Sequence, residues 1–168
     1  LGHLMADRIG IAVAGSHGKT TTTGMIAHIL MEADLDPTVI VGGVLPSLGG
    51  NGRFGEGDYF VVEADEYDHM FLGLKPEVAI ILNIEHDHPD IYPSEEEYRA
   101  AFAQFARLLP EGGHLVTCAT DPGTAALHEE LNLVGIETTT YALSTSDDPP
   151  KAKNLAADYL ALDLRPNQ

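Results

Sequence analysis

The chain contains the glycine-rich stretch Gly15-Ser16-His17-Gly18-Lys19-Thr20-Thr21. An apolar run at residues 9–14 precedes it and predicts a strand, and residues 20–33 carry apolar side chains at helical spacing. A glycine-rich turn between a strand and a helix directs backbone N–H groups toward an anion. We therefore expect the amides of residues 16–21 to bind phosphate, Lys19 to neutralise phosphate charge and the Thr20 hydroxyl to ligate Mg²⁺. The alternative is a surface turn at a helix start.

The regions around this loop alternate between strand and helix patterns. Further strands are expected at residues 38–41, 59–63, 78–83, 114–118 and 138–143, and a helix at 123–131. Ser94 and Glu97 have the spacing of a capping box and predict a helix that ends before Pro110. The alternation predicts an α/β fold, with a mainly parallel sheet and flanking helices. Residues 42–57 are expected to form a loop, 144–154 a linker, and 157–164 an additional antiparallel strand.

Length and composition restrict the class of protein. At 168 residues, we expect the chain, residues 1–168, to form one domain. The net charge of −17 argues against nucleic acid as a partner. The longest aliphatic run, Val78 to Leu82, is far shorter than the roughly 18 residues of a membrane-spanning helix, so no membrane association is expected. A single cysteine, Cys118, fits a reducing cytoplasmic location.

Acidic side chains follow two of the predicted strands. Glu63-Ala64-Asp65-Glu66-Tyr67-Asp68 ends one strand, and Asn83-Ile84-Glu85-His86-Asp87-His88-Pro89-Asp90 ends another. Ligands of open α/β sheets bind outside the carboxyl ends of the strands, so both segments should meet the glycine-rich loop at one edge. A solvated acidic face is the alternative.

Taken together, the three segments resemble the central ATP-binding domain of the Mur ligase family. Val13 stands where the common P-loop has its first glycine, and the shorter loop Gly15-x-x-Gly18-Lys19-Thr20 is similar to that of this family. The resemblance implies a P-loop NTPase-like domain that uses ATP and Mg²⁺. It implies metal ligation by Thr20, Glu63 and His88 and catalytic roles for Lys19, Glu63 and His88. It implies nucleotide contacts from the loop, namely Gly15, Ser16, His17, Gly18, Lys19, Thr20 and Thr21.

Within the family, the sequence is most similar to the alanine-adding members. The sequence Glu63-Ala64-Asp65-Glu66 is similar to that of the alanine-adding members and of those that recycle a muropeptide tripeptide. Both kinds also lack the carbamylated lysine that several sister enzymes carry where Phe102 stands here. The compact stretch from Phe71 to Pro76 is more similar to the alanine-adding members. This resemblance implies a ligase of peptidoglycan synthesis that joins L-alanine to UDP-N-acetylmuramate through an acyl phosphate. Three alternatives remain: a member that recycles a muropeptide tripeptide, a non-catalytic nucleotide-binding module, and a plain metal-binding domain.

The resemblance also has limits along the chain. Family enzymes have three domains, so we expect this chain to be a truncated ATPase core that does not turn over alone. His69 and His86 match no metal-binding position of the family and are expected to be structural. His17 is expected to contribute its backbone amide rather than its ring.

Overall fold

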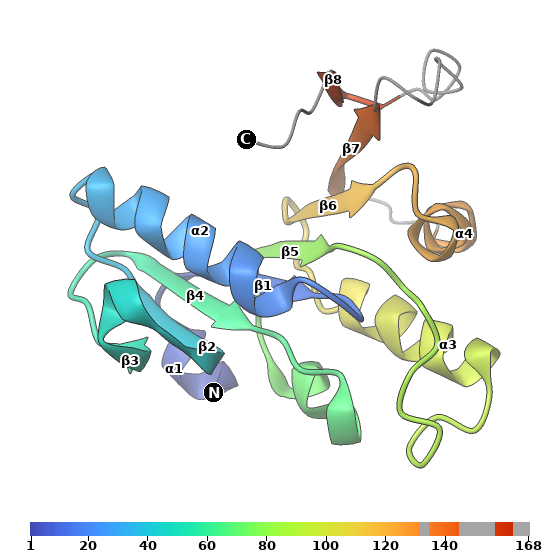
Figure 1. The fold of residues 1–168 in the computed structure, drawn as a ribbon, viewed down its shortest axis with the longest axis horizontal. Coiled ribbons are helices and arrows are strands. Elements are labelled where there is room, and N and C mark those ends of the chain that lie inside the picture. The colour runs from blue at the N-terminus through green and yellow to red at the C-terminus, as the bar shows by residue number, and fades with distance from the viewer. Residues whose placement is uncertain (132–134, 145–156, 163–168) are drawn as a thin grey trace, which may run out of the picture.

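The computed structural model describes residues 1–131, 135–144 and 157–162. These residues form an eight-stranded sheet in the order β3-β2-β4-β1-β5-β6-β7-β8 (Figure 1). The strands are β1 (Ile9–Ala14), β2 (Thr38–Leu45), β3 (Gly50–Arg53), β4 (Tyr59–Glu63), β5 (Val78–Ile81), β6 (His114–Cys118), β7 (Glu137–Ser144) and β8 (Tyr159–Leu162). The α-helices are α1 (Gly2–Met5), α2 (Lys19–Glu32), α3 (Glu95–Ala106) and α4 (Pro122–Glu130), and the 3₁₀-helices are η1 (Pro46–Leu48) and η2 (Tyr67–Gly73).

The sheet is parallel except for the pairing of β3 with β2. The expected α/β class with a mainly parallel sheet is therefore confirmed. The antiparallel expectation for residues 157–164 is wrong, because β8 runs parallel to β7 with Tyr159 opposite Tyr141. An alternating pattern gives the two faces of a strand but not its direction, and the chain between the two strands is long enough for a parallel crossover. The predicted linker at 144–154 lies outside the described residues, apart from its first residue, Ser144, which ends β7.

The loop expected at residues 42–57 is also partly wrong. Strand β2 continues to Leu45, and β3 returns antiparallel to it after η1, with Gly50 opposite Leu45. The glycines of this region hide the strand pattern, because they add no alternating side chains.

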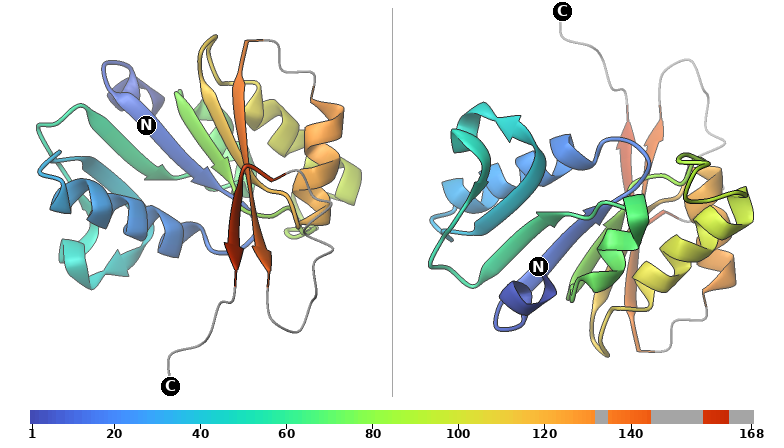
Figure 2. Two further views of the ribbon diagram at one scale, coloured as in Figure 1. Left: turned by 90° about the horizontal axis from the view of Figure 1, so that it is seen from above. Right: turned by 90° about the horizontal axis from the view of Figure 1, so that it is seen from below.

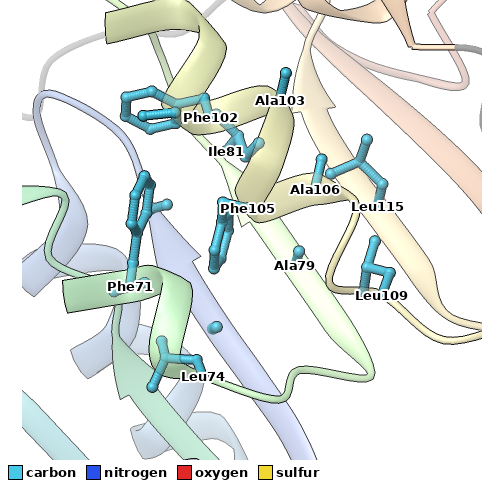
Figure 3. Packing of buried hydrophobic residues seen from close by; sticks show 14 of the residues in the cluster. Phe71, Leu74, Ala79, Ile81, Phe102, Ala103, Phe105, Ala106, Leu109 and Leu115 are labelled. Atoms are coloured by element: carbon cyan, nitrogen blue, oxygen red, sulfur yellow. The ribbon is translucent and has the colours of Figure 1, made fainter. Parts of the chain in front are cut away.

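Helices cover both faces of the sheet (Figures 1 and 2). Helix α2 packs its Ala27 against Val39, Val41 and Val61 on one face. On the other face, α1, η2, α3 and α4 contribute to a larger core with the strands. Phe71 of η2 stacks on Phe105 of α3, with ring centroids 4.9 Å apart (Figure 3).

The helix predicted from the capping box is α3, and the Ser94 side chain accepts a hydrogen bond from the Glu97 amide at 3.2 Å. The acidic first turn and the buried aromatic face of α3 both favour the helix. None of the helices in the described part of the chain is both long and apolar enough to cross a membrane.

Candidate nucleotide and metal site

The glycine-rich loop lies at the carboxyl end of β1, in the centre of the sheet. Gly15 has φ +136° and Gly18 has φ +85°, a conformation that side chains with a Cβ rarely adopt. Gly18 is the N-cap of α2. The loop and Glu63 line a cavity of about 370 Å³. The sequence thus places a helix N-terminus beside an open cavity, as an anion site requires.

Asn83 holds the first half of this loop. Its backbone oxygen accepts from the Ser16 amide at 3.2 Å, and its side-chain oxygen accepts from the His17 amide at 2.8 Å. In contrast, the amides of residues 18–21 have no acceptor among the described residues, since they form the first turn of α2. The amides of residues 18–21 are therefore open to a ligand, whereas those of Ser16 and His17 have acceptors within the protein.

The Ser16 hydroxyl joins the loop to two other segments. It donates to the Glu85 carbonyl at 2.8 Å and accepts from the Glu85 amide at 2.9 Å. It also lies 3.0 Å from the hydroxyl of Tyr98 on α3. The Ser16 hydroxyl therefore holds the loop against the segment after β5 and against α3.

Lys19 lies at the start of α2 and turns toward the interior. Its Nζ donates to the Gly15 carbonyl at 2.7 Å and lies 2.8 Å from Oε2 of Glu66. The Glu66 side chain is only 1% exposed. The sequence pattern singled out Lys19, but it gave no role to its buried partner.

Thr20 and Glu63, two of the expected metal ligands, are in contact. The Thr20 hydroxyl lies 3.0 Å from each carboxylate oxygen of Glu63, which also accepts from the Gly42 amide at 2.7 Å. A Cβ at Gly42 would lie only 3.1 Å from the carboxylate. Gly42 lies within β2, in a segment that was expected from the sequence to be a loop, and its lack of a side chain leaves room for the Glu63 carboxylate.

The donor set suits Mg²⁺. A hydroxyl and a carboxylate are oxygen ligands, and Mg²⁺ bound at nucleotide sites keeps several waters and takes phosphate oxygens as further ligands. Among the residues that the structure describes, no three His, Cys, Asp or Glu side chains form a metal cluster. Phosphate and water would therefore have to complete the coordination sphere.

His88, the third expected metal ligand, lies in the loop after β5 with φ +55°. Its Nε2 is 3.6 Å from Oε1 of Glu66, and its ring contacts the Tyr67 ring edge-on at 5.1 Å. Tyr67 donates to Asp90 at 3.0 Å, and this bond raises the pKa of the Tyr67 phenol. The structure thus brings His88 toward the carboxylate that also binds Lys19, whereas Glu63 contacts Thr20.

The other histidines near the site have different partners. His86 Nε2 lies 2.9 Å from the Tyr92 carbonyl, and His69 Nδ1 lies 3.3 Å from the Tyr92 hydroxyl. Both contacts fit the structural roles expected for them. The exposed His17 ring lies 3.4 Å from the Glu85 carboxylate.

Three contributors to the site were missed at the sequence level. Glu66, Asn83 and Tyr98 each belong to a quoted motif or helix, but their contacts span 47 to 82 residues along the chain. The only usable signal in the sequence was the position of Glu66 three residues after Glu63, because both residues then lie at the end of the same strand.

A central glycine-rich loop at the carboxyl edge of a parallel sheet, with helices on both faces, defines a P-loop-like α/β domain. The model of the Mur ligase middle domain matches residues 13–162, and the chain belongs to the Mur ligase family. It is 51% identical over 144 residues to a UDP-N-acetylmuramate–L-alanine ligase from Rubrobacter xylanophilus, a match that covers 86% of this chain and 32% of that protein. A second such ligase, from Frankia alni, is 51% identical over 125 residues, covering 74% of this chain and 21% of that protein.

Solved structures show the same relationship. UDP-N-acetylmuramate–alanine ligase from Thermotoga maritima superposes with a TM-score of 0.69 at 35% identity, covering 83% of this chain and 30% of that chain. A ligase from Neisseria meningitides that joins L-alanyl-γ-D-glutamyl-meso-diaminopimelate to UDP-N-acetylmuramate gives a TM-score of 0.74 at 27% identity, covering 82% and 47%. The chain therefore spans about a third or less of the curated relatives described above.

Proposed function

We propose that this chain is the nucleotide-binding core of an ADP-forming ligase that adds L-alanine to UDP-N-acetylmuramate in peptidoglycan synthesis. The observation that carries the proposal is the contact of Thr20 with Glu63 beside the open amides of residues 18–21. The identity of 51% to two alanine ligases favours L-alanine as the amino acid. ATP and Mg²⁺ would be required, and the cytoplasm, where ATP is available, is the proposed location.

The reaction has two steps. ATP phosphorylates the lactyl carboxylate of UDP-N-acetylmuramate to an acyl phosphate, and the amine of L-alanine then displaces phosphate to form an amide. In the first step, negative charge spreads over the transferred phosphoryl group, so catalysis depends on positioning and electrostatic stabilisation.

Each loop residue has a defined part in this reaction. The amides of residues 18–21 would bind the phosphates, and the Lys19 ammonium would neutralise the charge on the transferred group. Thr20 and Glu63 would hold Mg²⁺, and His88 would serve a second metal position with phosphate oxygens. Bound Mg²⁺ would supply positive charge that neutralises phosphate oxygens, which would favour ATP binding by a chain of net charge −17.

The test is ligase activity of the full-length protein. ADP release should depend on UDP-N-acetylmuramate, Mg²⁺ and L-alanine together, and mass spectrometry should show the alanyl product. Faster ADP release with the tripeptide L-alanyl-γ-D-glutamyl-meso-diaminopimelate than with L-alanine would identify the recycling type instead. ATP binding without any dependence on either acceptor would favour the nucleotide-binding module, and failure to bind ATP with Mg²⁺ would favour the plain metal-binding domain.

A further inference from the structure

Glu66 is a fully buried carboxylate at the point where three segments meet. Lys19 of α2 approaches both of its oxygens, at 2.8 and 3.0 Å. The Tyr98 hydroxyl of α3 donates to Oε1 at 3.3 Å, and His88 Nε2 lies 3.6 Å from the same oxygen. The Tyr92 hydroxyl donates to the Glu66 backbone carbonyl at 2.5 Å. Glu66 is therefore fixed by its surroundings rather than free to follow a ligand.

The Lys19 ammonium has three N–H donors. One points to the Gly15 carbonyl at 2.7 Å and one to Glu66, while the Ser16 carbonyl lies 3.5 Å away. All three donors thus face acceptors of the protein. A nucleotide phosphate can bind this ammonium only by taking the place of one of them.

Glu66 and a nucleotide phosphate are two anions that compete for the Lys19 ammonium. Charge-assisted hydrogen bonds are among the strongest polar contacts, and the Lys19 side chain is only 14% exposed, so water weakens its bond to Glu66 little. The carbonyls of Gly15 and Ser16 are neutral and carry no competing charge. Glu66 is therefore the acceptor whose presence most opposes transfer of Lys19 to phosphate.

We propose that Glu66 is a positioning residue that docks Lys19 in the nucleotide-free protein and competes with nucleotide phosphate for its ammonium. The proposal rests on the proposed function, since it requires a nucleotide at the loop. Glu66 weakens the affinity for nucleotide and returns Lys19 to a defined position when ADP leaves. It acts through Lys19 and does not contact the nucleotide.

A double-mutant cycle on nucleotide binding tests this role. Dissociation constants for Mg·ADP and for Mg²⁺ with β,γ-imido-ATP are measured by calorimetry on the full-length protein and on E66Q, K19M and E66Q/K19M. Gln keeps an oxygen that can accept from Tyr98 but has no charge. E66Q should bind nucleotide about tenfold more tightly than the native protein, as expected when one charged competitor is removed. In the K19M background, the same change should alter affinity less than about twofold.

Two further variants separate this effect from others. Glu85→Gln removes an exposed carboxylate beside the same loop that pairs with His17 rather than Lys19, and it should leave affinity within about twofold. Glu66→Asp keeps the charge but shortens the side chain, and it should tighten binding about threefold. If E66Q does not fold, the nucleotide affinity of Glu66→Asp tests the proposal in its place. Thermal melting establishes that each protein is folded.

The outcomes are distinct. Unchanged or weaker binding in the Glu66 variants overturns the proposal, and so does equal tightening in the K19M background or in Glu85→Gln. Absence of nucleotide binding by the native protein overturns both this proposal and the proposed function. Nucleotide binding with the expected cycle, but without acceptor-dependent ADP release, contradicts the ligase function alone.

Discussion

The hydroxyl of Ser16 in the phosphate loop lies 3.0 Å from the hydroxyl of Tyr98 on α3. These residues are 82 positions apart in the sequence. Burial and the neighbouring Glu66 carboxylate raise the pKa of the Tyr98 phenol, so it stays protonated and can donate at neutral pH. The pair ties the loop to the aromatic core.

Removing this hydroxyl should loosen the loop without unfolding the domain. Tyr98→Phe keeps the ring contact with Phe102 but loses the bonds to Ser16 and Glu66. We expect the free energy of unfolding in urea to fall by about 1 kcal/mol, because the single phenol proton that Ser16 and Glu66 share as acceptors is lost. Tyr159→Phe, at an exposed position, is the control and should change stability by less than about 0.5 kcal/mol. Equal stability of Tyr98→Phe and the native protein would contradict a tie through this hydroxyl.

Lys19→Ala should abolish most of the activity of the full-length ligase. Under the proposed function, Lys19 would act on charge that grows in the transition state, so kcat should fall by about a hundred- to a thousandfold while the far-UV circular dichroism spectrum stays unchanged. Acceptor-dependent ADP release measures the rate. Lys75→Ala, at an exposed position far along the chain, should retain native turnover. Turnover by Lys19→Ala within a few-fold of native would exclude Lys19 from the reaction.

Glu63→Gln should change the requirement for metal. It keeps a side-chain oxygen beside Thr20 but loses the charge that attracts Mg²⁺, so the Mg²⁺ concentration for half-maximal rate should rise about tenfold or more. The matched control is Glu77→Gln, which changes an exposed carboxylate between the two acidic segments 63–68 and 83–90. The assignment fails if both variants respond to Mg²⁺ as the native protein does.

The free energy of unfolding at acidic pH should depend on Asp87. The His88 amide donates to its carboxylate at 2.7 Å and lowers the pKa of the Asp87 carboxyl. A carboxyl whose pKa is lower in the folded state stabilises the fold above its unfolded pKa of about 3.9, and this contribution is lost as pH falls through the folded pKa. Urea denaturation between about pH 6 and about pH 3 should show the stability difference between native protein and Asp87→Asn shrinking as pH falls. A difference that stays constant would show that the bond does not affect titration.

The sequence predicted most of the sheet because strand and helix signals are local. The segments 9–14, 59–63 and 114–118 match β1, β4 and β6 in full, and the capping box at Ser94 marks the start of α3. Strand β3 escaped prediction, since Gly50 and Gly52 give it no alternating apolar face. The parallel direction of β8 was not predicted either, because the direction of pairing depends on contacts with β7 that the sequence pattern of β8 does not contain.

The positions of some candidate site residues could also be predicted from the sequence. Motif spacing indicated Lys19, Thr20 and Glu63, because each follows a strand end or starts a helix. The partners of these residues were not predictable, since it is the pairing of β4 with β1 that brings Glu66 and Lys19 together. The roles of Asn83 and Gly42 likewise come from the neighbours that the sheet order gives them.

The last prediction concerns the second metal position. Phe102 stands where several relatives are expected to carry a carbamylated lysine, and it is fully buried against Tyr98 and Phe71, with ring centroids 5.1 and 5.4 Å away. An aromatic ring offers no amine to carbamylate, so removal of bicarbonate should leave acceptor-dependent ADP release unchanged.

Under the proposed function, His88 would serve this metal position with phosphate oxygens. His88→Ala should lower that rate about a hundredfold while altering Mg·ADP affinity only a few-fold. His86→Ala is the matched control, since its ring bonds the Tyr92 carbonyl and its loss should reduce thermal stability more than turnover. Rates measured with and without bicarbonate, for all three proteins, decide the question. Strong bicarbonate dependence of the native protein, or native activity in His88→Ala, would show that the metal is held in another way.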